Sequence, residues 1–307
     1  MSAPPRATYW IDGKATSAEA AHAPVLAHGL HYGTAVFEGI RAYDTPRGIA
    51  IFRLGDHLLR FFASAAHYGL EPGYSLDRLR AAIVETVRAS GLRDAYIRPL
   101  AYFGDETIAL TPRSHCSTHV AIAVFGFPPL MEGTAGARAT ISPVQKFSSR
   151  ALPATVKASG HYTNSVLALQ DAVARGFDEA ILLNERGEVS EGSGENIFIV
   201  RDAALRTNDA SADILYGITR DSILQIAGAE GIPATVGPIA LDDLWQADEA
   251  FFTGTAAEVI PILSIDARPL PQRRPITTAL REAYARIVHA GDERYDHWLT
   301  FVAPPAP

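Results

Sequence analysis

Residues 154–200, ATVKASGHYTNSVLALQDAVARGFDEAILLNERGEVSEGSGENIFIV, combine a lysine among small residues with a glycine-rich acidic motif. Lysine is scarce in this chain: Lys14, Lys146 and Lys157 are the only three, so 24 of the 27 basic residues (27 − 3) are arginine. A desolvated lysine can act as a neutral amine nucleophile, whereas arginine keeps its proton. Lys157 is therefore either an ordinary surface lysine or a reactive group, and its neighbours must decide between the two.

The composition is that of an ordinary soluble protein with one large or two medium domains. The chain has 307 residues, of which 48% are hydrophobic and 20% are charged. A net charge of −7 without any basic run argues against nucleic-acid binding. No segment is apolar enough to span a bilayer or to serve as a signal peptide, so we expect a cytoplasmic protein. The single cysteine, Cys116, excludes an internal disulfide and a cysteine-rich metal site, and we expect no metal.

The first part of the chain predicts helices packed on a mostly antiparallel sheet. Apolar residues at helical spacing predict helices over 57–68 and 76–90, and Gly91 ends the second. Strands are expected at 9–11, 40–43, 49–53, 95–103 and 119–127. The fold class is therefore α/β, in the α+β arrangement.

A segment dense in proline and glycine, GFPPLMEGTAG at 126–136, separates two expected domains. We place a small N-terminal domain at 1–127, an interdomain linker at 128–138 and a large C-terminal domain at 139–307. The C-terminal domain is expected to hold strands at 139–143, 179–183, 196–200 and 250–253, and helices at 164–175, 219–231 and 275–290.

Two short motifs could hold a phosphate group. Gly217-Ile218-Thr219-Arg220 opens a predicted helix, with Thr219 as the expected N-cap, and free backbone N–H groups there favour an anion. Thr253-Gly254-Thr255-Ala256-Ala257 follows a predicted strand and has only small residues, so an anion can approach the backbone closely. Threonine is also a routine N-cap and Gly-Thr a routine turn. Neither motif matches a Walker or dinucleotide-binding loop, and the pattern suits a single phosphate monoester.

An amine, a phosphate site and a carboxylate are together what pyridoxal 5'-phosphate requires of a protein. Glu191 and Glu195 both fit as the acid beside the ring nitrogen, although both could equally be turn residues. No HExxH pair, Cys/His cluster or GxSxG motif indicates a different chemistry. A Ser-His-Asp triad stays open at this point, because its members need not be close in sequence.

Six motifs in order make the chain resemble the branched-chain aminotransferases, which are fold-type IV pyridoxal-phosphate enzymes. The motifs are HYGTAVFEGIRAY, YIRP, KASGHYTNS, EGSGENIF, GITR and FFTGTAAEVIP, and the resemblance runs from about Tyr9 to the last helix. EGSGEN and GITR are shared across fold type IV, whereas HYGTxVFEGIR, YIRP and TGTAAEV narrow the resemblance to the branched-chain group. The resemblance implies two domains with the cofactor in the cleft between them. It also implies a homo-oligomer, a dimer or a higher even-numbered assembly, in which the partner subunit completes the pocket.

The resemblance implies a role for each matching residue. Lys157 would be the catalytic Schiff-base lysine, Glu191 would pair with the ring nitrogen, and Tyr162 would bond the ring hydroxyl. The other cofactor-binding residues would be Arg53 in the strand IAIFR, Gly194, Asn196, Ile218, Thr219, Gly254 and Thr255. The substrate pocket would comprise Tyr32, Phe37, Gly39, Tyr96, Arg98, Leu130, Ala256 and Ala257.

The residues themselves support some of these roles better than others. Phe37 and Tyr96 alone would suggest core packing, whereas Arg98, between Ile97 and Pro99 in a strand, needs an anion if it is buried. The usual Gly-Gly-Asn-Tyr is here residues 159–162, SGHY. The usual Pro-Gly-Ile-Thr-Arg begins here with tyrosine, and many members carry an aromatic residue near position 130. These departures leave the cofactor residues in place and leave open whether aromatic amino acids or simple amines are accepted.

The predicted function is transfer of the amino group of L-leucine, L-isoleucine or L-valine to 2-oxoglutarate by a ping-pong mechanism. A D-amino-acid or R-amine transaminase of the same fold is the main alternative. YIRP and TGTAAEV argue against an aminodeoxychorismate lyase. The joint presence of Lys157, Glu191 and Arg53 argues against a homologue without enzymatic activity.

Overall fold

The computed structural model describes residues 7–127 and 134–303 and divides into two compact units. The first unit comprises the described residues of Met1–Pro128 together with Val156–Gly160 and Arg286–Pro307. The second comprises those of Pro129–Thr155 and His161–Ala285. We expected one boundary, in the linker at 128–138, with all later residues in the second domain. Instead, Val156–Gly160 and the described residues of Arg286–Pro307 belong to the first unit. Residues 128–133 of that linker lie outside the described residues.

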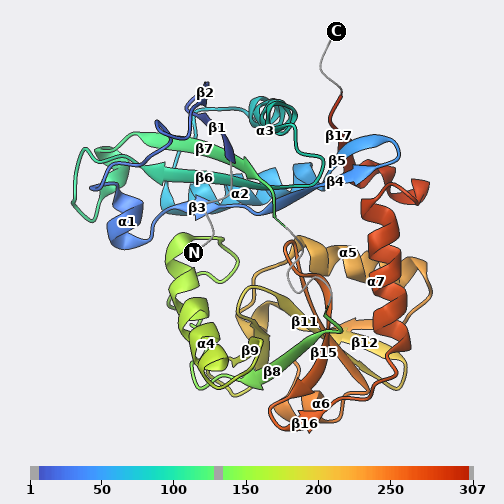
Figure 1. Ribbon diagram of the computed structural model, residues 1–307. Coiled ribbons are helices and arrows are strands. Elements are labelled where there is room, and N and C mark those ends of the chain that lie inside the picture. The colour runs from blue at the N-terminus through green and yellow to red at the C-terminus, as the bar shows by residue number, and fades with distance from the viewer. Residues whose placement is uncertain (1–6, 128–133, 304–307) are drawn as a thin grey trace. The chain divides into compact units, whose positions relative to one another are not determined.

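The first unit is built on an antiparallel sheet with, in the described residues, eight strands (Figure 1). Along the sheet the order is β17-β5-β4-β6-β7-β1-β2, and β3 pairs with β6. The strands are β1 (Ala7–Ile11), β2 (Lys14–Thr16), β3 (Val36–Phe37), β4 (Ile40–Thr45), β5 (Gly48–Phe52), β6 (Ala95–Phe103), β7 (Thr118–Phe125) and β17 (Leu299–Phe301).

Two long helices, α2 (Leu54–Tyr68) and α3 (Leu76–Ser90), pack on this sheet. Leu58, Phe61 and Ala65 recur every three or four residues, so they fall on one face of α2, and all three are fully buried in the core cluster. Ser75 caps α3 by accepting a hydrogen bond from the Arg78 amide, and Gly91 ends it in the left-handed conformation. The expected helices and strands of this part are confirmed, with shifted ends. A short helix, α1 (His28–Tyr32), precedes β3.

The second unit is built on a mixed sheet with nine strands among the described residues, in the order β10-β9-β8-β15-β14-β11-β12-β13, with β16 on β15. Strand β8 is parallel to both β9 and β15, and β12 is parallel to β13, while the other pairs are antiparallel. The strands are β8 (Ala137–Ile141), β9 (Glu179–Leu183), β10 (Val189–Gly192), β11 (Asn196–Arg201), β12 (Ala204–Thr207), β13 (Ala234–Val236), β14 (Glu249–Gly254), β15 (Glu258–Ile265) and β16 (Arg268–Pro269).

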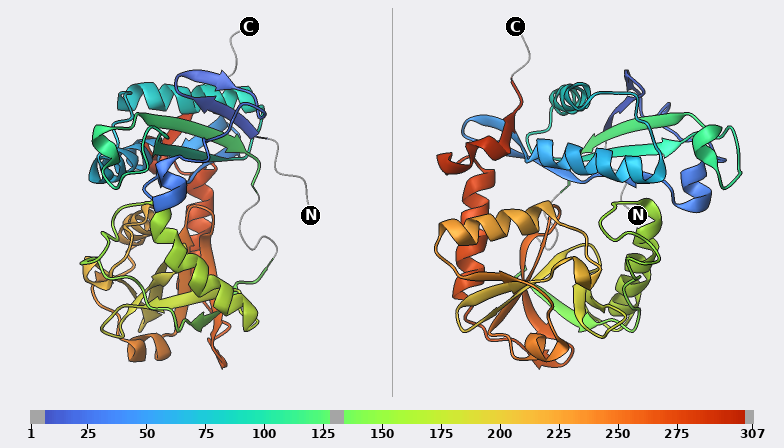
Figure 2. Two further views of the ribbon diagram at one scale, coloured as in Figure 1. Left: turned by 90° about the vertical axis from the view of Figure 1, so that its left-hand side faces the viewer. Right: turned by 180° about the vertical axis from the view of Figure 1, so that it is seen from behind.

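Helices flank this sheet: α4 (Tyr162–Ala174), α5 (Ile218–Ala229), α6 (Leu241–Trp245) and α7 (Pro275–Val288), which is divided between the units after residue 285. Figures 1 and 2 show α4 running alongside β9, where Ala168 and Ala172 pack on Ala180 and Leu182. Small residues on α4 allow this close approach. No helix within residues 7–127 and 134–303 is both long and apolar enough to cross a membrane.

Candidate active site

Lys157 lies on a short segment that adds to the sheet of the first unit. The Phe37 amide donates to the Lys157 carbonyl at 3.1 Å, and the Gly160 amide donates to the Gly33 carbonyl at 2.9 Å. The Lys157 amide donates to Ser64 Oγ of α2 at 3.1 Å. The backbone of the lysine is therefore fixed against the HYGTAVFEGIR motif, although the two stretches are far apart in the sequence.

Glycine is required where these two stretches cross. Gly33 has φ of +66°, and a Cβ built on it would lie only 2.6 Å from Gly160 Cα. A side chain at Gly33 would push the lysine segment away, because the neighbouring atoms belong to the backbone. A Cβ at Gly160 would lie 3.0 Å from the Gly33 carbonyl oxygen, which is a tight contact. Residues 159–162 are SGHY where the family usually has Gly-Gly-Asn-Tyr, and the glycine at the crossing point, Gly160, is the one that both sequences share.

An arginine and the lysine face the same aromatic ring in the first unit. Lys157 Nζ lies 5.2 Å from the centroid of the Phe37 ring, and Arg98 Cζ lies 4.7 Å from it. Arg98 also lies 5.3 Å from the Tyr96 ring centroid and donates from Nη2 to the Tyr96 hydroxyl at 3.2 Å. Its Nε is buried without a hydrogen-bond partner in the described part of the chain. A buried, unpaired guanidinium nitrogen is costly, so the site is suited to receive an anion.

Gly39 allows the Tyr96 hydroxyl to sit beside the backbone. A Cβ at Gly39 would lie 2.0 Å from that hydroxyl oxygen. Tyr96 has little room to move, since its ring packs against Phe125 and Phe127 with centroids 5.5 and 5.1 Å away. Tyr32 lies apart on α1, where it is 44% exposed and its hydroxyl donates to the Ile108 carbonyl at 2.9 Å. Phe37, Gly39, Tyr96 and Arg98 therefore lie together, and Tyr32 faces solvent.

Arg53 was expected in a strand, and this expectation is wrong. Strand β5 ends at Phe52, and Arg53 forms the N-cap of α2 in the left-handed conformation with φ of +48°. Its Nε donates to Asp56 Oδ2 at 2.6 Å, and its guanidinium carbon lies 5.0 Å from the Trp298 ring centroid. A non-glycine residue in this conformation costs about 1–2 kcal/mol, and such strain gathers at functional sites.

The second unit holds the acidic group, Glu191, at the end of β10. Among the described residues, its carboxylate accepts hydrogen bonds from three donors. Lys146 Nζ donates to Oε1 at 2.5 Å, and Asn196 Nδ2 and the Leu215 amide donate to Oε2 at 3.0 and 3.1 Å. Sequence reasoning missed Lys146, although the scarcity of lysine pointed to it as much as to Lys157.

Asn196 joins this carboxylate to the start of α5. Its Nδ2 also donates to the Leu215 carbonyl at 2.8 Å, and its Oδ1 would lie 2.0 Å from a Cβ at Gly217. Gly217 is the N-cap of α5, so the expectation that Thr219 caps the helix is wrong. Thr219 lies instead in the first turn and is buried, as is Ile218. The N-terminus of this 12-residue helix favours an anion.

The second small-residue motif forms the turn between β14 and β15. Residues 255–257 close this hairpin, and a Cβ at Gly254 would lie 3.5 Å from the Gly194 carbonyl oxygen. Asn196 pairs directly with Thr253 across the strands, and Thr253 Oγ1 is buried without a hydrogen-bond partner among the described residues. The EGSGEN motif, the start of α5 and this turn thus meet within the second unit.

The contacts described above do not include Tyr162. Tyr162 is the first residue of α4 in the second unit and is half-buried. Leu130 lies outside the described residues.

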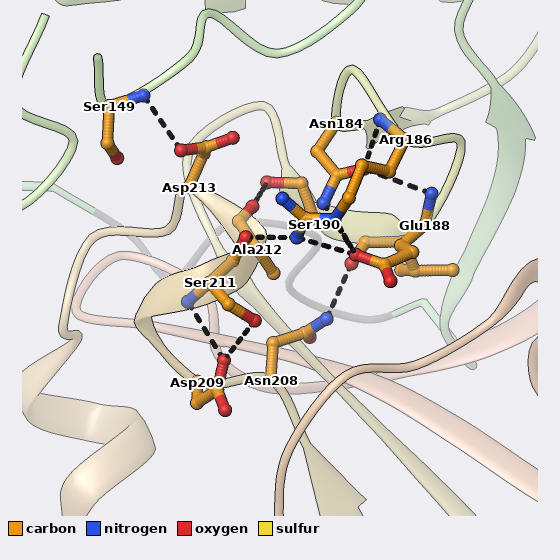
Figure 3. Close-up of polar contacts among 11 residues, drawn as sticks. Ser149, Asn184, Arg186, Glu188, Ser190, Asn208, Asp209, Ser211, Ala212 and Asp213 are labelled. Atoms are coloured by element: carbon orange, nitrogen blue, oxygen red, sulfur yellow. Dashed lines mark hydrogen bonds and ion pairs between the residues drawn. The ribbon is translucent and has the colours of Figure 1, made fainter.

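Polar contacts fasten residues 208–213, the loop that precedes Leu215 in the chain; Figure 3 shows the contacts of Asn208, Asp209, Ser211, Ala212 and Asp213. Ser190 Oγ donates to the Ala212 carbonyl at 2.6 Å, and Asp213 accepts the Ser149 amide at 2.7 Å. Asn208 Nδ2 donates to the Val189 carbonyl at 2.5 Å. Because Val189 and Ser190 precede Glu191 on β10, the bonds of Ser190 and Asn208 hold the loop on the strand that presents the carboxylate.

The structure also separates Glu191 from Glu195. Burial and the charge of Glu179 raise the pKa of Glu195 well above its ordinary value. Glu179 Oε1 accepts the amides of Ala180 and Ser193, and Glu195 Oε2 accepts the Gly194 amide. Of these two glutamates, Glu191 is the one whose contacts among the described residues include an ammonium group, that of Lys146, which makes it the better acid to hold a cationic ring.

Replacement of Glu195 by glutamine should change the pH dependence of stability. The folded protein keeps a proton on Glu195 that the unfolded chain releases near pH 4.5, so stability is lost as the pH rises from about 4.5 through the higher folded-state pKa. A glutamine amide can donate to Glu179 at every pH, so this part of the decline should vanish in Glu195→Gln. Urea midpoints measured from pH 5 to 9 would test it, and parallel curves for the two proteins would contradict it.

Known proteins that are similar to this chain point to one family. The family model described as amino-transferase class IV matches residues 35–265. A branched-chain-amino-acid aminotransferase of Pseudomonas aeruginosa is 42% identical over 298 residues, which cover 95% of this chain and 96% of that protein. The structure of a branched-chain aminotransferase from Thermoproteus uzoniensis with norvaline has a TM-score of 0.93 and 46% identity, covering 96% of this chain and 99% of that one.

A third relative was solved with a cofactor derivative. It is the T.th. branched-chain amino acid aminotransferase complexed with N-(5'-phosphopyridoxyl)-L-glutamate, with a TM-score of 0.92 and 42% identity over 96% of this chain and 98% of that one. The expected fold class and the resemblance read from the six motifs are therefore confirmed. The chain belongs to the class IV aminotransferases and, within them, to the branched-chain-amino-acid aminotransferase family.

Proposed function

We propose that the protein is a pyridoxal-phosphate-dependent transaminase that moves the amino group of L-leucine, L-isoleucine or L-valine to 2-oxoglutarate in a ping-pong reaction. The observation that carries this proposal is the placement of Lys157 and Arg98 around one ring, that of Phe37. The buried Nε of Arg98 has no hydrogen-bond partner among the described residues. The ligands of two relatives, norvaline and a phosphopyridoxyl-glutamate adduct, have the chemistry that the proposal requires.

The residues fit the cofactor by their chemistry. Glu191 offers a carboxylate in an ion pair for the ring nitrogen, and the start of α5 with the turn after Gly254 offers backbone and hydroxyl donors for a phosphate. The buried Thr253 hydroxyl beside that turn has bonding capacity left. When bound, pyridoxal phosphate supplies an aldehyde for the amino group and an electron-withdrawing ring. We propose that it is held by Arg53, Lys157, Tyr162, Glu191, Gly194, Asn196, Ile218, Thr219, Gly254 and Thr255.

The chain's own groups would then carry the proton and hold the substrate. Arg98 would bind the substrate carboxylate, and the faces of Phe37 and Tyr96 would contact its aliphatic side chain. Since Arg98 and the Lys157 amine lie on the same ring, a carboxylate on Arg98 brings the substrate Cα toward the amine. Lys157 would first act as the nucleophile that anchors the cofactor and then, when displaced, as the general base that moves the Cα proton.

We also propose that the chain forms at least a homodimer. Hydrogen bonds from Tyr32 to the Ile108 carbonyl and between His28 and the Ala109 carbonyl hold α1 beside residues 108–110. Together these segments expose a group of large apolar side chains, which indicates an interaction surface. Its members are Val25, Leu26, Leu30, Tyr32, Ile108 and Leu110.

The visible spectrum of the purified protein tests the proposed activity. We expect L-leucine, added without a 2-oxo acid, to bleach the band of lysine-bound cofactor and release pyridoxamine 5'-phosphate on denaturation. Added 2-oxoglutarate should then restore the band with formation of L-glutamate. A yellow protein that ignores L-leucine but responds to D-leucine or (R)-1-phenylethylamine would replace the substrate claim. A protein that stays colourless with added cofactor would overturn the whole proposal.

A further inference from the structure

Lys146 forms a buried ion pair with Glu191, and the proposed reaction assigns no role to this lysine. The two residues are 8% and 7% exposed, and Lys146 Nζ lies 2.5 Å from Glu191 Oε1. Taking both charges out of water costs about as much as their attraction returns, so such a pair adds little net stability. A role of Lys146 in the cofactor site therefore explains the presence of this buried pair better than a contribution to stability does.

The lysine is held at both ends. Its backbone amide donates to the Leu183 carbonyl at 2.9 Å, and its ammonium lies 4.5 Å from the centroid of the Phe147 ring. The backbone bond fixes the start of the side chain, and the contact with Phe147 places the ammonium between that ring and the carboxylate. Lys146 can therefore set the orientation of the Glu191 carboxylate rather than follow it.

The two oxygens of Glu191 are not equivalent. Each carboxylate oxygen can accept about two hydrogen bonds. Oε2 already accepts Asn196 Nδ2 and the Leu215 amide, while Oε1 accepts Lys146 alone among the described residues. The remaining acceptor position is therefore on Oε1. Lys146 uses one lone pair of this oxygen, so the position of its ammonium determines the direction in which the other lone pair points.

We infer that Lys146 is a positioning residue that aims the free lone pair of Glu191 Oε1 at the pyridine nitrogen of the cofactor. The inference rests on the proposed function, because it requires pyridoxal phosphate as the ligand. Lys146 acts only through Glu191 and contacts no reacting atom, so it is distinct from Lys157.

Cofactor affinity tests this inference without any measurement of turnover. Apo protein is titrated with pyridoxal phosphate and with its 1-deaza analogue, in which a C–H group replaces the ring nitrogen. In Lys146→Met we expect the affinity for pyridoxal phosphate to fall about 10-fold, as when a hydrogen bond to a charged group is misaligned. The affinity for the analogue should change much less. The separate variant Lys146→Arg, which keeps a positive charge, should have the wild-type preference for the nitrogen-containing ring. Lys14→Met, at an exposed position of β2, is the matched control.

Two outcomes would overturn the inference. Affinities for the cofactor and the analogue that fall by the same factor in Lys146→Met would show an effect unrelated to the ring nitrogen, and unchanged affinities would show no role. If Lys146→Met does not fold, the double variant Lys146→Met/Glu191→Gln, which leaves no unpaired charge, is compared with Glu191→Gln. The quantity compared is the affinity for pyridoxal phosphate divided by the affinity for the 1-deaza analogue. An equal ratio in the double variant and in Glu191→Gln supports the inference, and a lower ratio in the double variant overturns it.

Failure of this inference differs from failure of the proposed function. Wild-type protein that binds no pyridoxal phosphate would defeat the proposed function itself. Wild-type protein that binds the cofactor and reacts with L-leucine, while Lys146→Met keeps the wild-type affinity ratio, would defeat only the role of Lys146.

Discussion

Replacement of Lys157 by alanine is expected to abolish transamination, with kcat/KM falling by at least about 10⁴-fold, because one side chain supplies both the nucleophile and the general base. Neither other lysine can take its place. Lys146 is engaged with Glu191, and Lys14 is exposed in β2. Single-turnover absorbance with L-leucine would measure the loss of the chemical step directly.

The fold should survive this substitution. The segment is held through backbone atoms, by the bond from the Phe37 amide to the Lys157 carbonyl and that from the Lys157 amide to Ser64 Oγ, which alanine keeps. A thermal midpoint close to that of the wild type would confirm this. Lys14→Ala serves as the control and should keep full activity. Transamination retained by Lys157→Ala would remove the lysine from the mechanism.

The sequence predicted most helices and strands, although it misplaced Arg53 and Thr219 at two helix starts, and it did not predict the long-range pairing. Helical spacing and Gly91 predicted α3 with its observed ends at residues 76 and 90, because helix formation depends on neighbours three and four residues away. The packing of the Lys157 segment on residues 33–37 depends on backbone hydrogen bonds between distant stretches. No periodicity encodes such pairing, so a division at the linker alone was the natural expectation.

The candidate site shows the same limit. Glu191 and Glu195 are equivalent by residue type, and the sequence alone left the choice open. Their environments differ because Lys146 and Leu215, far from them in the chain, lie beside Glu191, whereas Glu179 lies beside Glu195. Both residue types fit the role, but only the folded arrangement gives one of them an ammonium partner and the other a neighbouring carboxyl group.

Replacement of Glu38 by glutamine is expected to cost about 3–5 kcal/mol of stability, the usual penalty for removing one member of a buried ion pair. Glu38 follows Phe37 in the chain and is fully buried, and its carboxylate accepts Nε and Nη2 of Arg60 at 2.7 and 2.9 Å. It also lies 2.7 Å from His57 Nδ1. Glutamine would leave the Arg60 charge without its counter-ion. Urea unfolding measures the loss, and Glu85→Gln, at an exposed ion pair of α3, should cost under about 1 kcal/mol.

The same cluster should make the wild-type protein acid-sensitive in two stages. Burial lowers the pKa of His57, so the stability it contributes is present above its ordinary value of 6.5 and is lost as the pH falls below that. Burial opposes ionisation of Glu38, but the charge and hydrogen bonds of Arg60, followed by those of His57, overcome it and lower the Glu38 pKa below its ordinary value of 4.5. Its contribution is therefore lost as the pH falls below about 4.5.

Glu38→Gln has no carboxyl to protonate, so its stability should lack this second decline. Unfolding free energies of the two proteins should therefore converge in acid, and a constant difference from pH 7 to pH 3 would show that Glu38 is not held ionised by Arg60 and His57.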